Sequence, residues 1–197
     1  ANVGEPEEVD GVWTNGAVLN LANVTGLREL WSDFSEAESG IYSAIYKNAA
    51  LNTVFGVTGV GEGVAASVDI GLATSLSGTA DTLKLALDGD NTGGEVGVGW
   101  NNNANSGIET IAIDVEEGNA TQLKFAGNAT VKNIVVTGAG DLTIGISPGL
   151  GDEMAKVELF DASAATGDIT WTTGELEKAA TILGGARDDS FTLNGSK

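Results

Sequence analysis

The chain has 197 residues, and its 28 Asp and Glu against nine Lys and Arg give a net charge of −19 at pH 7. Because the basic residues are few and scattered, the composition argues against nucleic acid and anionic membranes as partners, since both bind through clustered positive charge. The absence of Cys and His excludes disulfides, thiolate nucleophiles, Cys-type zinc sites and a Ser-His-Asp triad, whereas oxygen ligands suited to calcium and magnesium remain.

The length fits one domain or one array of stacked repeats, and 42% hydrophobic residues are too many for a disordered acidic tail. No apolar run approaches the roughly 20 residues that a transmembrane helix needs. The chain begins with Ala1 rather than Met, so we interpret it as a processed or excised piece. We expect an acidic N-terminal segment over residues 1–17 and a single all-β repeat domain over residues 18–197.

Strand signals dominate the chain, because runs of Val, Ile, Leu and Thr repeatedly end in Gly, Asn or Asp. Helix signals are weak: an apolar stripe over residues 32–47 is interrupted by Gly40 and suggests a short helix or loop at best, and a second weak signal covers residues 175–180. The sequence therefore predicts an all-β chain. In chain order, the expected strands are residues 18–21, 53–57, 64–70, 82–87, 109–115, 133–137, 142–146 and 168–172.

A short apolar pattern recurs along the chain at a nearly constant offset. An apolar residue, two mostly polar residues and a second apolar residue begin at positions 27, 51, 80, 108, 131 and 157, with gaps of 24, 29, 28, 23 and 26 residues. Such offsets are typical of stacked β-coils, in which each coil adds a strand and covers the apolar face of its neighbour. We therefore expect a β-helix-like solenoid. A β-sandwich is the alternative, although its turns usually come roughly every 8 to 12 residues.

The first candidate calcium site is the oxygen-rich turn over residues 88–94, with Asp88 and Asp90 as the candidate ligands. The segment begins like an EF-hand loop, but its twelfth position is Gly99, where a bidentate Glu is needed. An EF-hand is therefore rejected. A looser calcium turn and an ordinary hairpin turn both remain as interpretations.

The second candidate is the stretch GGARDDSFT over residues 184–192. It resembles the calcium-binding nonapeptide of RTX proteins, whose pattern is G-G-x-G-x-D-x-U-x, with U a large apolar residue. The resemblance implies Asp189 as the ligand carboxylate, beside Asp188, with backbone carbonyls near Gly184 and Ala186 completing the site. Arg187 replaces the third glycine, and its charge could fill the site instead of an ion. A plain Gly-Gly turn into a final strand is the alternative.

The ordered series of repeats from about residue 80 to residue 194, ending in this turn, resembles the repeat region of bacterial surface-layer (S-layer) proteins that carry RTX-type segments. That resemblance implies a secreted, extracellular or cell-surface protein that self-assembles into a sheet or filament with calcium at its turns and without catalysis. At −19, copies of the chain should repel one another, and calcium bound to carboxylates would cancel part of that charge.

Two other functions remain open. A calcium-dependent adhesin or carbohydrate-binding module, with surface polysaccharide as its partner, would use the scattered Trp13, Trp31, Trp100 and Trp171, of which Trp100 is our first candidate for exposure. A glycoside hydrolase would need two matched carboxylates, and no pair stands out among the 28. We therefore expect a homopolymer rather than an enzyme.

Overall fold

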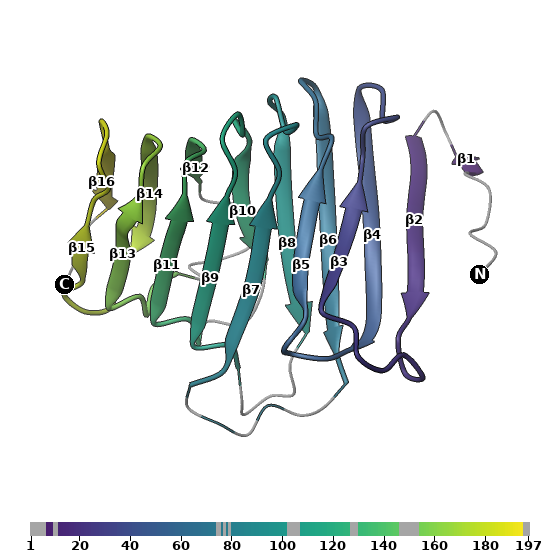
Figure 1. Cartoon of the computed structure of the whole chain (residues 1–197), viewed down its shortest axis with the longest axis horizontal. Coiled ribbons are helices and arrows are strands. Elements are labelled where there is room, and N and C mark those ends of the chain that lie inside the picture. The colour runs from purple at the N-terminus through teal and green to yellow at the C-terminus, as the bar shows by residue number, and fades with distance from the viewer. Residues whose placement is uncertain are drawn as a thin grey trace.

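A computed structural model of the chain describes residues 7–9, 12–73, 76, 78, 80–101, 107–126, 130–145 and 154–194, and these contain β-strands and no helix (Figure 1). The strands are β1 Glu7–Val9, β2 Val12–Asn20, β3 Glu29–Asp33, β4 Gly40–Ala49, β5 Val54–Thr58, β6 Val64–Leu72, β7 Thr82–Leu87, β8 Glu95–Asn101, β9 Thr110–Val115, β10 Gln122–Ala126, β11 Asn133–Gly138, β12 Leu142–Ile144, β13 Leu159–Ala165, β14 Ile169–Glu175, β15 Thr181–Leu183 and β16 Ser190–Asn194.

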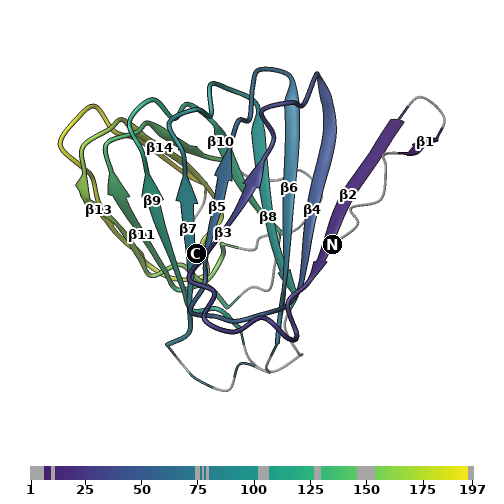
Figure 2. The same cartoon turned by 45° about the vertical axis from the view of Figure 1, so that its right-hand side comes forward.

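The strands alternate between two sheets. The even-numbered strands and β1 form a nine-stranded sheet in the order β1-β2-β4-β6-β8-β10-β12-β14-β16, and the odd-numbered strands from β3 to β15 form a seven-stranded sheet. Neighbouring strands are parallel, except that β1 is antiparallel to β2. Each odd-numbered strand and the even-numbered strand after it therefore make one coil, and the coils stack along the long axis (Figures 1 and 2). This confirms the all-β solenoid; the β-sandwich alternative is wrong.

The register of the odd-numbered strands tests the repeat directly. Thr110 of β9 pairs with Thr82 and with Asn133, and Asn133 in turn pairs with Leu159. Each of these residues follows a repeat start by two positions. The repeat starts at residues 80, 108, 131 and 157 therefore occupy equivalent places, as predicted. The two earlier starts are out of phase. In the pairing of β3 with β5, Leu30 lies opposite Phe55 rather than Val54. The positions equivalent to residue 80 are therefore 50 and 25, whereas the sequence pattern placed the starts at 51 and 27. The pattern matched Val54 because it is apolar, although it faces outward.

Both helix predictions are wrong. Residues 32–47 form the end of β3, a bend and most of β4. In β4 the side chains of Ala44 and Tyr46 are buried while Lys47 is exposed, which is the two-residue period of a strand, and pairing with β2 and β6 on both sides outweighs the weak local preference. Residues 176–180 form a bend after β14. The first six residues of the expected acidic segment lie outside the described part, and β2 begins within the segment at Val12.

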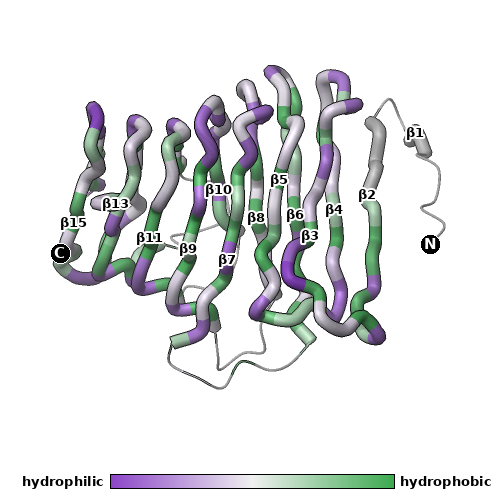
Figure 3. Tube along the Cα trace, in the orientation of Figure 1, coloured by the Kyte–Doolittle hydropathy of each residue, from purple (hydrophilic) through white to green (hydrophobic). Residues whose placement is uncertain are grey.

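The core is built from rows of apolar side chains that stack at equivalent places in successive coils. Leu83, Ile111, Ile134 and Phe160 are paired neighbours in the seven-stranded sheet, and each is 0% exposed. At the C-terminal end, the ring of Phe160 stacks on Trp171 of the facing sheet at a centroid distance of 4.5 Å. Apolar residues alternate along the strands, while many of the most hydrophilic residues lie in the bends (Figure 3).

A buried hydrogen bond joins the two sheets at the N-terminal end. The hydroxyl oxygens of Ser32 on β3 and Tyr46 on β4 are 2.5 Å apart, and the Tyr46 ring stacks on Phe55. Burial raises the pKa of the Tyr46 phenol, an effect that the hydrogen bond with Ser32 partly offsets. Burial therefore disfavours the ionised phenol in the folded chain.

We predict that Tyr46→Phe lowers the free energy of unfolding by about 1–2 kcal/mol, because the Ser32 hydroxyl is left buried without its partner. The double variant Ser32→Ala, Tyr46→Phe should cost less than the sum of the two single variants, since it leaves no orphaned group. Urea unfolding of the four proteins measures the coupling. If the losses in free energy of unfolding were strictly additive, they would contradict a hydrogen bond between Ser32 and Tyr46.

The same phenol should make the fold sensitive to alkali. Since the folded-state pKa is raised, the unfolded chain ionises first, near pH 10. This contribution to stability is complete below about pH 10 and is lost as the pH rises further. Thermal unfolding between pH 8 and 11 should therefore show a steeper loss of stability in the wild-type protein than in Tyr46→Phe. Parallel curves would show that Tyr46 does not contribute.

Candidate functional site

Three features outside the core could carry a function: the bends with the predicted calcium ligands, a groove on the seven-stranded sheet, and the two ends of the solenoid. The bends in question lead from each odd-numbered strand to the next even-numbered strand. They lie together along the upper edge in Figure 1 and are called the upper bends below. Both predicted calcium turns belong to this series.

In the upper bend between β7 and β8, the polar side chains mainly hold the backbone. Asp88 Oδ1 accepts a hydrogen bond from the Asp90 amide at 3.0 Å, and Asp90 itself is exposed. Asn91 is 0% exposed; its Nδ2 donates to the Val57 carbonyl, and its Oδ1 accepts from the Val60 amide. Asn91 therefore fastens this bend to the preceding coil, as buried amides do when every hydrogen-bonding group is satisfied.

The predicted nonapeptide forms the upper bend between β15 and β16. Asp189 Oδ1 accepts from the Ile169 amide of the preceding coil at 3.0 Å, and Oδ2 accepts from the Gly185 amide at 2.6 Å. A Cβ on Gly184 would lie 2.4 Å from Asp189 Oδ2, so this close approach requires glycine. Asp188 and Arg187 are exposed. The carboxylate of Asp189 thus acts as an acceptor for two backbone amides, which accounts for the Gly-Gly turn without an ion.

The amide of Ala186 also faces the preceding coil and donates to the Ala165 carbonyl at 3.1 Å. The structure does not bring the two predicted calcium turns together. They are four coils apart, which at about 4.8 Å per strand is about 19 Å. In the described ranges there is no group of three or more His, Cys, Asp or Glu that could hold a metal ion. Calcium binding at either turn stays a prediction.

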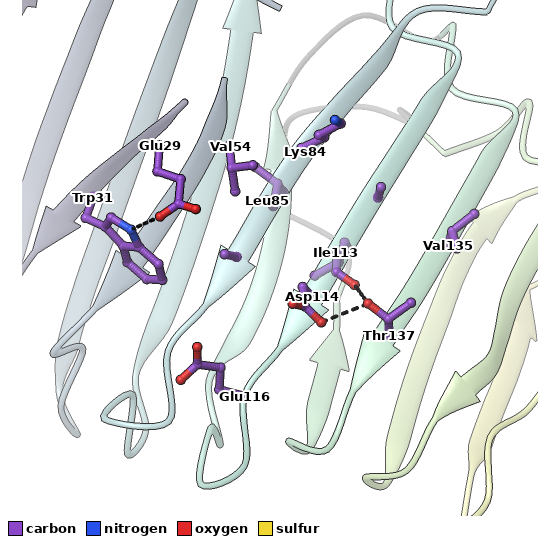
Figure 4. A pocket seen from close by; sticks show the side chains of 12 residues that line it. Glu29, Trp31, Val54, Lys84, Leu85, Ile113, Asp114, Glu116, Val135 and Thr137 are labelled. Atoms are coloured by element: carbon purple, nitrogen blue, oxygen red, sulfur yellow. Dashed lines mark hydrogen bonds between the residues drawn. The ribbon is translucent and has the colours of Figure 1, made fainter. Parts of the chain in front are cut away.

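A groove of about 360 Å³ lies on the outer face of the seven-stranded sheet (Figure 4). Two rows of outward-facing residues form it, one on each side of the strand axis. The first row is Trp31, Gly56, Ala86, Asp114 and Thr137; the second is Glu29, Val54, Lys84, Ala112 and Val135. Glu116 lies at one end of the groove. We call this feature the Trp31 groove.

The sequence named the wrong tryptophan. Trp100 is 6% exposed and packs edge-on against Phe125, whereas Trp31 is 38% exposed. Trp171 is fully buried, and the side chain of Trp13 lies outside the described residues. The missed signal was the alternation in Glu29-Leu30-Trp31-Ser32-Asp33, where Trp31 shares its face with two carboxylates. The repeat pattern ended at Leu30 and the helix signal began at Ser32, so the alternation across this stretch was divided between two interpretations.

The two ends of the solenoid leave strand edges without neighbours in the described part of the chain. The seven-stranded sheet ends in β3 and β15, and the nine-stranded sheet ends in β1 and β16. β1 covers only Val12–Thr14 of β2. In the last coil, Leu183 is 43% and Leu193 is 56% exposed. Edges of this kind can pair with another chain.

No protein-family model, curated protein or solved structure matches this chain. Among the described residues, no helix is long and apolar enough to cross a membrane. The function must therefore be argued from the bends, the Trp31 groove and the ends.

We predict that Asp189→Ala destabilises the last coil in calcium-free buffer, because the Ile169 and Gly185 amides lose their acceptor. The expected loss is about 1–3 kcal/mol, with faster hydrogen exchange in β16. Asp188→Ala, at the exposed neighbouring position, is the matched control and should change little. If Asp189→Ala alters only calcium uptake and leaves the calcium-free protein unchanged, the structural role of this carboxylate is wrong.

Proposed function

We propose that the protein is a self-assembling structural protein of the cell exterior, whose copies stack end to end into a filament or sheet. The single observation that carries this proposal is that, among the described residues, the strands at both ends of the solenoid have edges without a neighbour. A parallel β-solenoid adds each coil by edge pairing and apolar contact, and the last coil offers both through β15, β16, Leu183 and Leu193. At the other end, the outer edge of β3 has no neighbour among the described strands.

The net charge of −19 supplies the control on this assembly. Copies repel one another at low ionic strength, and this repulsion opposes end-to-end contact. Calcium is abundant outside cells and binds oxygen ligands such as the exposed Asp90 and Asp188 of the upper bends. Neutralising these carboxylates, within one copy or between two, would permit association. Catalysis forms no part of this proposal.

The second candidate function, a calcium-dependent adhesin or carbohydrate-binding module, is favoured by one specific observation, the Trp31 groove. An exposed aromatic ring beside carboxylates on a flat sheet suits a sugar ring, since such rings present both apolar C–H groups and hydroxyls. The two functions use different parts of the surface, a sheet face and the solenoid ends, and they meet at β3, which carries Trp31 on its outer face and would pair through its edge.

We predict that light scattering and sedimentation show association of the wild-type protein as calcium rises from zero to about 10 mM, the upper range in which weak extracellular sites fill. Sodium chloride at matched ionic strength should produce less association, because screening alone does not bridge carboxylates. A protein that remains monomeric throughout at high concentration would refute self-assembly. Electron microscopy of the same samples distinguishes filaments and sheets from amorphous aggregates.

A charged side chain placed at the open end tests the geometry of association. Leu193→Lys should reduce calcium-dependent association several-fold, because it puts a charge on the edge strand. Thr143→Lys, on a middle strand of the same sheet, is the matched control. Both changes make the protein less negative, and this effect alone would favour association. A loss of calcium-dependent association in Leu193→Lys but not in Thr143→Lys would therefore identify the end as the contact. Equal behaviour of the two variants would contradict end-to-end stacking.

A further inference from the structure

The Trp31 groove has two walls and a shallow floor. Trp31 forms one wall from β3, and Asp114 with Thr137 forms the other from β9 and β11 (Figure 4). Between them, Ala86 and Ala112 present only methyl groups outward. A ligand that enters the groove therefore meets an aromatic ring on one side and a carboxylate on the other.

The position of Trp31 is fixed by a glycine on the adjacent strand. A Cβ on Gly56 would lie 2.2 Å from Cδ2 of the Trp31 ring, so the indole covers the Gly56 backbone and any larger residue there would displace it. The indole Nε1 donates a long hydrogen bond of 3.5 Å to Glu29 Oε2. These two contacts hold the ring on the sheet with part of its surface open to solvent.

The opposite wall is also positioned by neighbours. Thr137 Oγ1 donates to Asp114 Oδ1 at 2.8 Å, which leaves Oδ2 of this exposed side chain available to a ligand. Asp114 lies two strands beyond Gly56 in the same row, a span of about 10 Å at the usual strand spacing. With the indole over one side of that span, the space over Ala86 suits a group about as wide as a single sugar ring.

Charge in the Trp31 groove is unevenly placed. Glu29, Asp114 and Glu116 contribute three carboxylates, and Lys84 contributes the one ammonium group among the residues that line it. In Figure 4, Asp114 and Glu116 lie toward one end and Lys84 toward the other. The carboxylate end complements a cation through ion pairing, while the indole offers an apolar face on the far side of the groove.

We propose that the Trp31 groove binds a hexosamine unit with a free amine, as part of a cationic glycan. The protonated amine lies at the carboxylate end, near Asp114 and Glu116, and the apolar face of the sugar packs against Trp31. Ring hydroxyls donate to the remaining carboxylate oxygens, including those of Glu29. This ligand deepens the second candidate function above by naming the sugar class, and it does not require assembly.

A hexosamine is the ligand class proposed because one wall of the Trp31 groove is aromatic and the other carries carboxylates. A neutral sugar would use Trp31 but would leave the carboxylates without a cation. A lysine side chain or a polyamine would use the carboxylates but has no broad face to cover the indole. An amino sugar uses both, and the −19 charge of the chain attracts cationic polymers to the surface as a whole.

Titration of the protein in calcium-free buffer, followed by calorimetry or by tryptophan fluorescence, tests the proposal. The probes are glucosamine oligomers, N-acetylglucosamine oligomers and oligolysine of matched charge. Glucosamine oligomers should bind at least about tenfold more tightly than the acetylated oligomers, because acetylation removes the positive charge. Equal binding of those two probes would overturn the proposal. So would equal binding of oligolysine and glucosamine oligomers, which would indicate general charge attraction.

Variants assign the binding to the Trp31 groove. Trp31→Ala and Asp114→Asn should each weaken glucosamine-oligomer binding at least about fivefold, and Trp31→Phe should retain part of it because an aromatic face remains. Ile41→Ala and Asp69→Asn, exposed positions on the other sheet, are the matched apolar and charge controls and should bind normally. Circular dichroism checks that each variant is folded.

If Trp31→Phe and Asp114→Asn are folded and bind like the controls, the Trp31 groove is not the site and the proposal fails. Because the titration uses calcium-free protein, loss of assembly and loss of glycan binding are scored separately. A protein that assembles with calcium but binds no glucosamine oligomer would refute this inference and leave the structural function standing. The reverse outcome would support a binding module alone.

Discussion

Backbone hydrogen bonds between parallel strands join each coil only to the coils before and after it, and the rest of the structure depends on this one-dimensional order. A single coil cannot bury its apolar side chains, because the row of Leu83, Ile111, Ile134 and Phe160 is covered only when four coils stack in register. Stability is therefore shared between neighbours. Among the described residues, the coils at the two ends have a neighbour on one side only, and the proposed function uses their outer edges.

Side chains that face outward are free of this packing constraint, and the functional candidates all use them. The upper bends place Asp and Asn where they can accept hydrogen bonds from the neighbouring coil, as Asp189 and Asn91 do. The outer face of the seven-stranded sheet brings Trp31, Asp114 and Thr137 into one row although they are far apart in sequence. A regular core thus supports an irregular surface on which charge and aromatic groups can be placed independently.

The sequence predicted the architecture because the repeat and the strand periodicity both survive in single stretches of chain. It placed the strands of the middle coils well, and it failed where apolar residues occur on both faces, as in residues 32–47 and at Val54. The nonapeptide resemblance located a real turn, but it did not indicate that the Asp189 carboxylate accepts two backbone amides, one of them from the preceding coil. The Trp31 groove was not predictable, because its lining comes from five strands, β3, β5, β7, β9 and β11, and the sequence pattern placed β3 and β5 out of register with the others.

The strand direction has a mechanical consequence. The first and last described strands, β1 and β16, lie at opposite ends of the long axis, and the hydrogen bonds between coils run along that axis (Figure 1). A pulling force applied to the ends would therefore open these bonds one after another, as in a zipper, rather than shear many at once. The 28 residues from Thr82 to Thr110 occupy one strand spacing when stacked, about 4.8 Å, but span roughly 95 Å when extended. Each coil that unravels would thus increase the length of its own segment about twentyfold. Under load, a solenoid of this kind would act as an extensible tether.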